Sequence, residues 1–166
     1  MTDRRVRTGT KRRLVQCFSH LFASRPQPIA VEYTWDGKET VSRSTLWLGV
    51  IEGNTTPESI GQGQRLELDE FIIPVNVRLL GFVYGEVAEA AVEDVVNDIA
   101  AGLAATHRLT RWPGLDDGDV QSYLGIADVQ VGPMDGPGHT FPGGPGQTIQ
   151  GWGSFDLLCQ SHLDFD

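Results

Sequence analysis

Residues 65–81 read RLELDEFIIPVNVRLLG, and along this stretch the side chains alternate between two sets. In an extended chain one face would carry Leu66, Leu68, Glu70, Ile72 and Pro74, and the other Phe71, Ile73, Val75 and Val77. This alternation, rich in β-branched residues, predicts a strand that packs on at least one face. Pro74 has no N–H for a sheet hydrogen bond, so it marks an edge, a bulge or a bend.

Residues 86–106, which follow this strand, change to a helical period. Their apolar side chains recur every three or four positions, at Val87, Ala91, Val95, Ile99 and Leu103, and acidic residues occupy the other faces. A long strand followed by one amphipathic helix predicts a packing unit in which the helix covers one face of a sheet.

The remaining elements flank this unit. A first helix is predicted over residues 10–24, because Leu14, Phe18, Leu21 and Phe22 share one helical face. Strands are predicted over residues 30–35 and 41–51, joined by a hairpin turn at Asp36-Gly37, and over residues 120–131 and 148–165. Residues 54–64 read as a loop. The chain therefore predicts an α+β fold with a mixed or antiparallel sheet of about five strands, an N-terminal helix, and one long amphipathic helix packed on the sheet.

Composition indicates a single globular domain. The chain has 166 residues, 40% of them hydrophobic, which is enough to bury a core. Two cysteines, Cys17 and Cys159, are too few and too far apart for a disulfide framework. No apolar run approaches the roughly 20 residues of a membrane span, and the start does not read as a signal peptide, so we expect a protein made in the cytoplasm, with no membrane partner.

Charge is distributed unevenly. Residues 1–13 carry +5, so the remainder carries −14 of a net charge of −9. The acidic balance argues against general affinity for nucleic acid. We expect residues 1–13 to be a basic arm that docks on an acidic surface, or a solvated tail, and residues 14–166 to form the domain.

Residues 132–147, GPMDGPGHTFPGGPGQ, hold six glycines and four prolines. This composition predicts a long loop or a flexible arm within the domain.

No pattern in the chain predicts catalysis, a metal or a cofactor. The four histidines lack metal-ligand spacing, and Cys159 and His162 would point to opposite faces of a strand. Asp116, Asp117 and Asp119 lack the distal glutamate of a calcium loop. Neither a phosphate-binding glycine motif nor a nucleophile elbow is present. We therefore expect that the protein is not an enzyme.

The order of elements resembles that of the tail terminator (tail completion) proteins of long-tailed bacteriophages. The resemblance rests on the N-terminal helix, the hairpin opening on IAVEYT at residues 29–34, and the strand LDEFIIPVNV at residues 68–77. It continues through the helix at residues 86–106 to the closing segment GSFDLLC at residues 153–159. The Arg-rich start and residues 132–147 are not part of the family pattern.

The resemblance implies a virion structural protein of the tail and neck. Six subunits would form a ring that caps the tail tube protein and meets the head-side connector or stopper protein, while DNA passes through the lumen without specific binding. A tail tube protein or a stopper is the alternative, and a small ligand-binding or enzymatic domain is a further one.

Two sets of residues are candidates for these contacts. Subunit or partner interfaces are expected at Arg4, Arg5, Arg7, Lys11, Arg12, Arg13, Trp47, Trp112 and Trp152. The lumen or a ring face is expected at Glu67, Asp69, Glu70, Asp116, Asp117 and Asp119, for which ordinary outer surface is the alternative.

Overall fold

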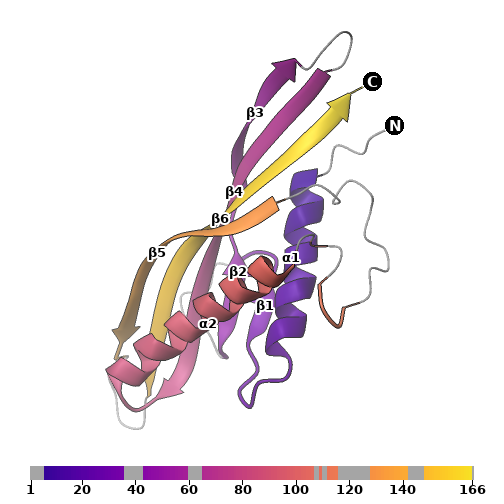
Figure 1. The fold of residues 1–166 in the computed structure, drawn as a ribbon. Helices are drawn as coiled ribbons and strands as arrows, with labels where there is room; N and C mark the ends of the chain where they lie inside the picture. Colours follow the sequence, from indigo (N-terminus) through magenta and orange to yellow (C-terminus); the bar gives the residue numbers. More distant parts are fainter. Residues whose placement is uncertain are drawn as a thin grey trace.

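The computed structural model describes residues 6–35, 43–59, 65–106, 109, 112–115, 128–141 and 148–165 (Figure 1). The described elements are α1 (Val6–Phe22), β1 (Ala30–Glu32), β2 (Thr45–Leu48), β3 (Glu52–Ser59), β4 (Arg65–Phe82), α2 (Gly85–Ala105), β5 (Asp128–Thr140) and β6 (Ile149–Phe165). One mixed sheet contains all of these strands, which confirms the predicted α+β fold.

The sheet is organised around β4 and β6. Its strand order is β1-β2-β4-β6-β5, with β3 also paired to β4. β4 and β6 are antiparallel from Arg65↔Phe165 to Phe82↔Ile149. The other edge of β4 is shared, because β3 pairs with its residues 65–72 and β2 with residues 75–78. The predicted central strand and closing strand are therefore confirmed.

Both helices pack on one face of the sheet, and the core lies beneath them. The odd-numbered residues of β4 from Phe71 to Leu79 are buried on this face, as are Phe155, Leu157 and Cys159 of β6. α1 contributes Leu14, Phe18 and Phe22, and α2 contributes Val92, Val95 and Ile99. Each such side chain stabilises the fold by about 1.5–3 kcal/mol through burial. The predicted amphipathic helix at residues 86–106 is confirmed as α2.

The two helices meet through Trp112. Its ring lies edge-on to Phe18 of α1, with 6.5 Å between centroids, and it also lies against Gly102 of α2. A Cβ atom at Gly102 would come within 2.5 Å of the Trp112 ring, so a glycine permits this close packing. Trp112 is buried in the core, and its prediction as an interface residue is wrong.

Three local predictions are wrong. β1 and β2 pair in parallel, so no hairpin joins them, and Asp36-Gly37 lies outside the described residues. Residues 54–59 belong to β3 and not to a loop, because they pair with β4 from Asn54↔Glu70 to Ser59↔Arg65. α1 begins at Val6, so residues 6–13 are helix and not an arm.

Residues 132–140 form most of β5, which contradicts the predicted loop. The register of β5 with β6 shifts between Val131 and Met134 and again between Asp135 and Gly138. Pro133 and Pro137 lie within these two irregularities of an edge strand, where a missing N–H is tolerated. Of the strand predicted over residues 120–131, residues 128–131 fall in β5 and residues 120–127 lie outside the described residues. Residues 142–147 of the predicted loop also lie outside them.

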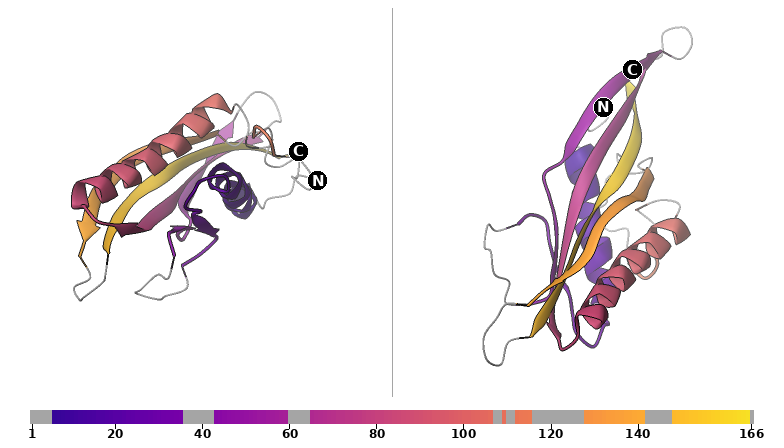
Figure 2. Two further views of the ribbon diagram at one scale, coloured as in Figure 1. Left: turned by 90° about the horizontal axis from the view of Figure 1, so that it is seen from below. Right: turned by 90° about the vertical axis from the view of Figure 1, so that its left-hand side faces the viewer.

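One part of the sheet runs past the helices. We define the strand extension as β3 (Glu52–Ser59), residues 65–70 of β4 and residues 160–165 of β6. Figure 2 shows these strands rising beyond both helices, with β4 between the other two.

Candidate assembly surfaces

The sheet has an open face that neither helix covers. Alternation along β4 and β6 places on it Ile72, Pro74, Asn76 and Arg78, with Trp152, Ser154, Asp156, Leu158 and Gln160. Among these, Trp152 and Leu158 are 38% and 42% exposed. Exposed apolar side chains that lie close together on a surface mark interaction sites.

A groove of about 540 Å³ crosses this open face near the base of the strand extension. Its floor contains the apolar side chains of Ile72 and Leu158, which are register partners on β4 and β6. Its polar lining comes from all four neighbouring strands: Glu52, Glu70, Asp128, Gln130 and Gln160.

The strand register fixes how these groups lie. Glu52, Ile72, Leu158 and Gln130 form one row across β3, β4, β6 and β5, and Glu70, Gln160 and Asp128 form the next row. Rows on one face are about 7 Å apart, and neighbouring strands are about 4.8 Å apart. The three carboxylates therefore surround the two apolar side chains, and none forms an ion pair with a basic residue that the structure describes.

Cys159 lies on the buried side of the groove. Burial, with a smaller contribution from the charge of Asp128, raises the pKa of the Cys159 thiol to about 12. Because its lining combines apolar side chains with three carboxylates, the groove can accommodate a side chain with an apolar stem and a positively charged end. In the described part of the chain, no three His, Cys, Asp or Glu residues are close enough together to hold a metal ion.

Basic residues of α1, predicted to form a docking arm, bind within the protein. Arg7 donates hydrogen bonds to Asp69, and Lys11 Nζ donates to the Gly49 carbonyl at 2.6 Å. Arg13 Nε donates to the Leu109 carbonyl at 2.8 Å. Arg12 is exposed, and Arg4 and Arg5 lie outside the described residues. The prediction of a free basic arm is therefore wrong for Arg7, Lys11 and Arg13.

The acidic residues predicted to face the lumen also differ in where the structure places them. Asp69 is buried beside Arg7, so its prediction as a lumen residue is wrong. Glu70 is exposed on the open face, as part of the groove. Glu67 lies within the strand extension, opposite Leu163, while Asp116, Asp117 and Asp119 lie outside the described residues.

Two tryptophans lie on the open face. Trp47 is 8% exposed because Trp35 stacks on it, with 6.3 Å between centroids. Trp152 remains accessible, and Gly138 of β5 lies against its ring. Of the three predicted interface tryptophans, Trp152 alone offers a large exposed surface.

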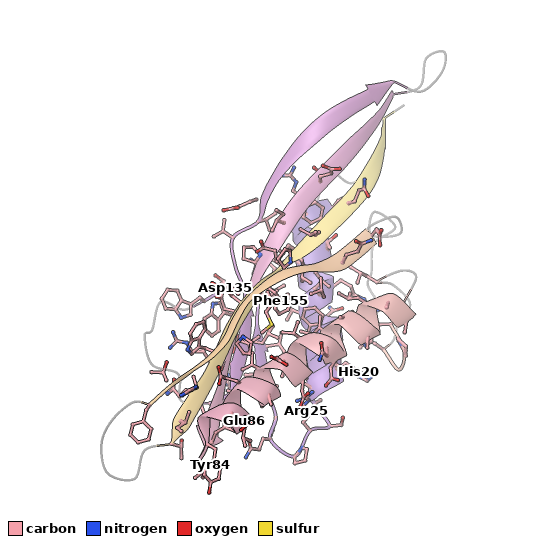
Figure 3. The ribbon with its side chains drawn as sticks, turned by 60° about the vertical axis from the view of Figure 1, so that its left-hand side comes forward. His20, Arg25, Tyr84, Glu86, Asp135 and Phe155 are labelled. Atoms are coloured by element: carbon pink, nitrogen blue, oxygen red, sulfur yellow. The ribbon has the colours of Figure 1, made fainter. Side chains whose placement is uncertain are left out.

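A second apolar surface lies at the other end of the sheet. We define the apolar tip as Val83, Tyr84, Val87 and Phe141, which are 53–73% exposed. It forms where β4 ends, α2 begins and β5 ends; Figure 3 shows Tyr84 pointing away from the sheet there. Gly85 permits close approach, because a Cβ atom at this position would come within 2.7 Å of the His139 ring. Periodicity along the sequence does not predict this surface, because its members come from the β4–α2 connection, from α2 and from the end of β5.

Neither described helix is long and apolar enough to cross a membrane. A scan of the chain against models of known protein families finds no match, and a search of curated proteins finds none either.

Proposed function

We propose that the protein is a virion structural protein, a tail terminator subunit that assembles head to tail into a ring of about six copies. The ring caps the tail tube and joins it to the head-side connector, and DNA passes through its lumen. The order of elements that resembles this family leads to the proposal.

The strand extension is the observation that carries it. Among the described strands, β3 has no partner on its outer edge, and β6 has none beyond Gln160, where its pairing with β5 stops. Unpaired strand edges are sites of assembly. Because the two edges belong to different strands, contact between them on neighbouring copies is head to tail, and such contacts close into a ring when the rotation permits.

The two ends of the molecule support a role between two partners. The strand extension and the apolar tip lie at opposite ends of the long strands (Figure 1). A subunit in a ring between a tube and a connector needs two distinct contact surfaces. Two surfaces of unlike chemistry meet this need, since one offers backbone edges and the other exposed apolar side chains.

The charge of the open face is compatible with DNA passage. Glu70, Asp128 and Asp156 belong to it, and Arg78 of β4 is a basic residue on the same face. A surface of this sign disfavours stable binding of the phosphate backbone.

The first test is the mass of the purified protein by light scattering, with negative-stain microscopy of the same fractions. We expect closed rings of about six copies, or monomers that form such rings on tail tubes. Long tubes would favour a tail tube protein instead. A monomer that ignores both tubes and connectors would overturn the proposal and favour a small ligand-binding or enzymatic domain.

A further inference from the structure

We infer that α1 fixes the angle at which the strand extension leaves the rest of the sheet, and that Arg7 and Lys11 are the residues through which it does so. The fixed angle is a property of the single subunit. Its consequence for assembly rests on the proposed function, because the strand edges of the extension are the edges that meet in the ring.

The sheet is interrupted and narrow where the strand extension begins. We define the junction as residues 72–75 of β4. The pairing of β4 with β3 ends at Ile72, and its pairing with β2 begins at Val75, so the ladder on this side is interrupted between them. On the other side β5 pairs with β6 only as far as Gln160, so three described strands continue beyond the junction. A sheet bends most easily where its ladder is disrupted and its width is small.

Two basic residues of α1, one helical turn apart, contact both sides of this line (Figure 1). Lys11 Nζ donates to the Gly49 carbonyl at 2.6 Å, and the Gly49 N–H donates to the Pro74 carbonyl at 2.6 Å, so Lys11 binds at the junction itself. Arg7 binds Asp69 of the extension, through Nε at 2.9 Å and Nη2 at 2.6 Å. Because α1 is one continuous helix, a change of angle at the junction would break one of these contacts or both.

The two halves of α1 are held by different kinds of contact. Its C-terminal half packs in the apolar core through Leu14, Phe18 and Phe22. The extension offers α1 polar groups instead: Asp69 and its register partner Ser161, which are 3% and 0% exposed, are its described side chains on the helix-covered face. Ser161 Oγ has no hydrogen-bond partner among the described residues. Apolar packing therefore fixes α1 on the body of the sheet, whereas the extension depends on directional, charge-assisted hydrogen bonds.

The surroundings of Lys11 favour one position of its ammonium group. The side chain is buried, and Nζ lies 4.1 Å from the centroid of the Tyr33 ring in addition to its bond to Gly49. Burial lowers the pKa of Lys11, and the carbonyl and the aromatic ring offset part of this cost of desolvation. Removal of the ammonium group would leave the Gly49 carbonyl without this donor, in the connection where β2 gives way to β3.

The angle matters for assembly because the free edges of β3 and β6 both lie in the extension. In the proposed ring these edges meet on neighbouring copies, so a change of angle at the junction displaces both of them. Edges that are already oriented associate without first losing conformational freedom. Arg7 and Lys11 are therefore positioning residues of the assembly surface, and they act from within the subunit.

Amide hydrogen exchange of the full chain, with the fold checked by circular dichroism, tests this inference. Arg7→Met with Lys11→Met keeps both apolar stems and removes both charged donors. We expect amides of β3 and of residues 65–70 to exchange about tenfold faster or more, while those of α2 stay near wild type. The conservative variant Arg7→Lys with Lys11→Arg should restore slow exchange, since both donors remain. The matched control, Arg12→Met, changes an exposed neighbour and leaves exchange unchanged.

Sedimentation velocity of the same variants then measures assembly, which we expect to be about tenfold weaker in the double methionine variant and normal in the control. If the double variant does not fold, Lys11→Met alone answers the same question. Unchanged exchange in the extension overturns the inference, and so does faster exchange spread equally over α2, because the two residues would then act on overall stability. Faster exchange confined to the extension, with wild-type assembly, overturns their role as positioning residues. Wild-type protein that never associates, with or without tail tubes, overturns the proposed function and leaves the fixed angle standing.

Discussion

Arg7 and Asp69, which are 62 positions apart, form an ion pair between the first turn of α1 and the base of the strand extension. Arg7 Nη2 lies 2.6 Å from Asp69 Oδ1, and Arg7 Nε lies 2.9 Å from Oδ2. Hydrogen bonding to Asp69 raises the pKa of Arg7, although partial burial opposes this rise. The pair connects the helix layer to the part of the sheet that offers strand edges for assembly.

Breaking this pair is expected to lower stability. Arg7→Ala leaves the carboxylate of Asp69 buried without its guanidinium partner, and we expect a loss of about 2 kcal/mol, below the range for fully buried pairs because Arg7 is partly exposed. Urea denaturation of Arg7→Ala, Asp69→Ala and the double variant measures the coupling. The double variant should lose less than the two single losses combined; strictly additive losses would show that the two residues act independently.

Substitution of the neighbouring residues Lys11 and Arg12 compares a buried basic side chain with an exposed one. Lys11 Nζ bonds the Gly49 carbonyl and lies 4.1 Å from the centroid of the Tyr33 ring, whereas Arg12 is exposed. We expect Lys11→Ala to destabilise the fold by about 1–3 kcal/mol, because a carbonyl loses a charged donor, and Arg12→Ala to change stability by less than about 0.5 kcal/mol. Thermal unfolding measures the loss of stability in each variant. Equal losses would mean that Lys11 contributes no more to stability than an exposed residue does.

Gly102 should not tolerate a side chain. Its Cβ would meet the Trp112 ring at 2.5 Å, so we expect Gly102→Ala to lose about 1–3 kcal/mol despite the better helix propensity of alanine. Trp112→Leu in the same background should recover part of this loss, because it removes the clashing ring. An increase in the stability of Gly102→Ala, measured by urea denaturation, would mean that α2 shifts readily away from Trp112.

Stability should decrease as the pH rises above about 9. Burial raises the pKa of both Cys17 and Cys159 to about 12 from a model-compound value of 9.0. Between these two values the unfolded thiols lose protons while the folded ones keep them, so the folded state binds more protons and the free energy of unfolding falls with pH. The contribution is complete below pH 9 and is lost towards pH 12.

Urea midpoints at pH 8 and pH 10 measure this dependence, and native thiols should react slowly with iodoacetamide at pH 8. Replacement of both cysteines by alanine should flatten the slope, whatever its effect on absolute stability. An unchanged slope would assign the pH dependence to other groups.

The apolar tip should affect assembly and not folding. Tyr84→Ser with Phe141→Ser removes two side chains that are 69% and 62% exposed, so the urea midpoint should change little. We expect capping of tail tubes or binding of the connector to weaken, as observed by microscopy of mixed components. Val50→Ser, at a position 79% exposed outside the tip, is the matched control. Normal assembly of the double variant would leave the tip without a role in the ring.

Sequence periodicity by itself determined the elements whose patterns are long and regular. Alternation along residues 65–81 located β4, and the helical period of residues 86–106 located α2 within one residue at each end. The closing strand was also predicted, over residues 148–165, and in the structure Phe155, Leu157 and Cys159 of β6 share the buried face. In each case one face of the element packs on the core, so the apolar residues recur along the sequence with the period of that element.

Only the tertiary structure decided how these elements combine. Pro133 and Pro137 argue against a strand until β6 is present beside them, with a register that shifts where they lie. The grouping of Glu52, Glu70 and Asp128 depends on strand register across four strands, and the Arg7–Asp69 pair depends on where α1 packs on β4. Register is a pairwise property of segments distant in the chain, and a shift of one residue would move every side chain to the opposite face. For this reason the elements could be predicted from the sequence, whereas the groove and the buried ion pair could not.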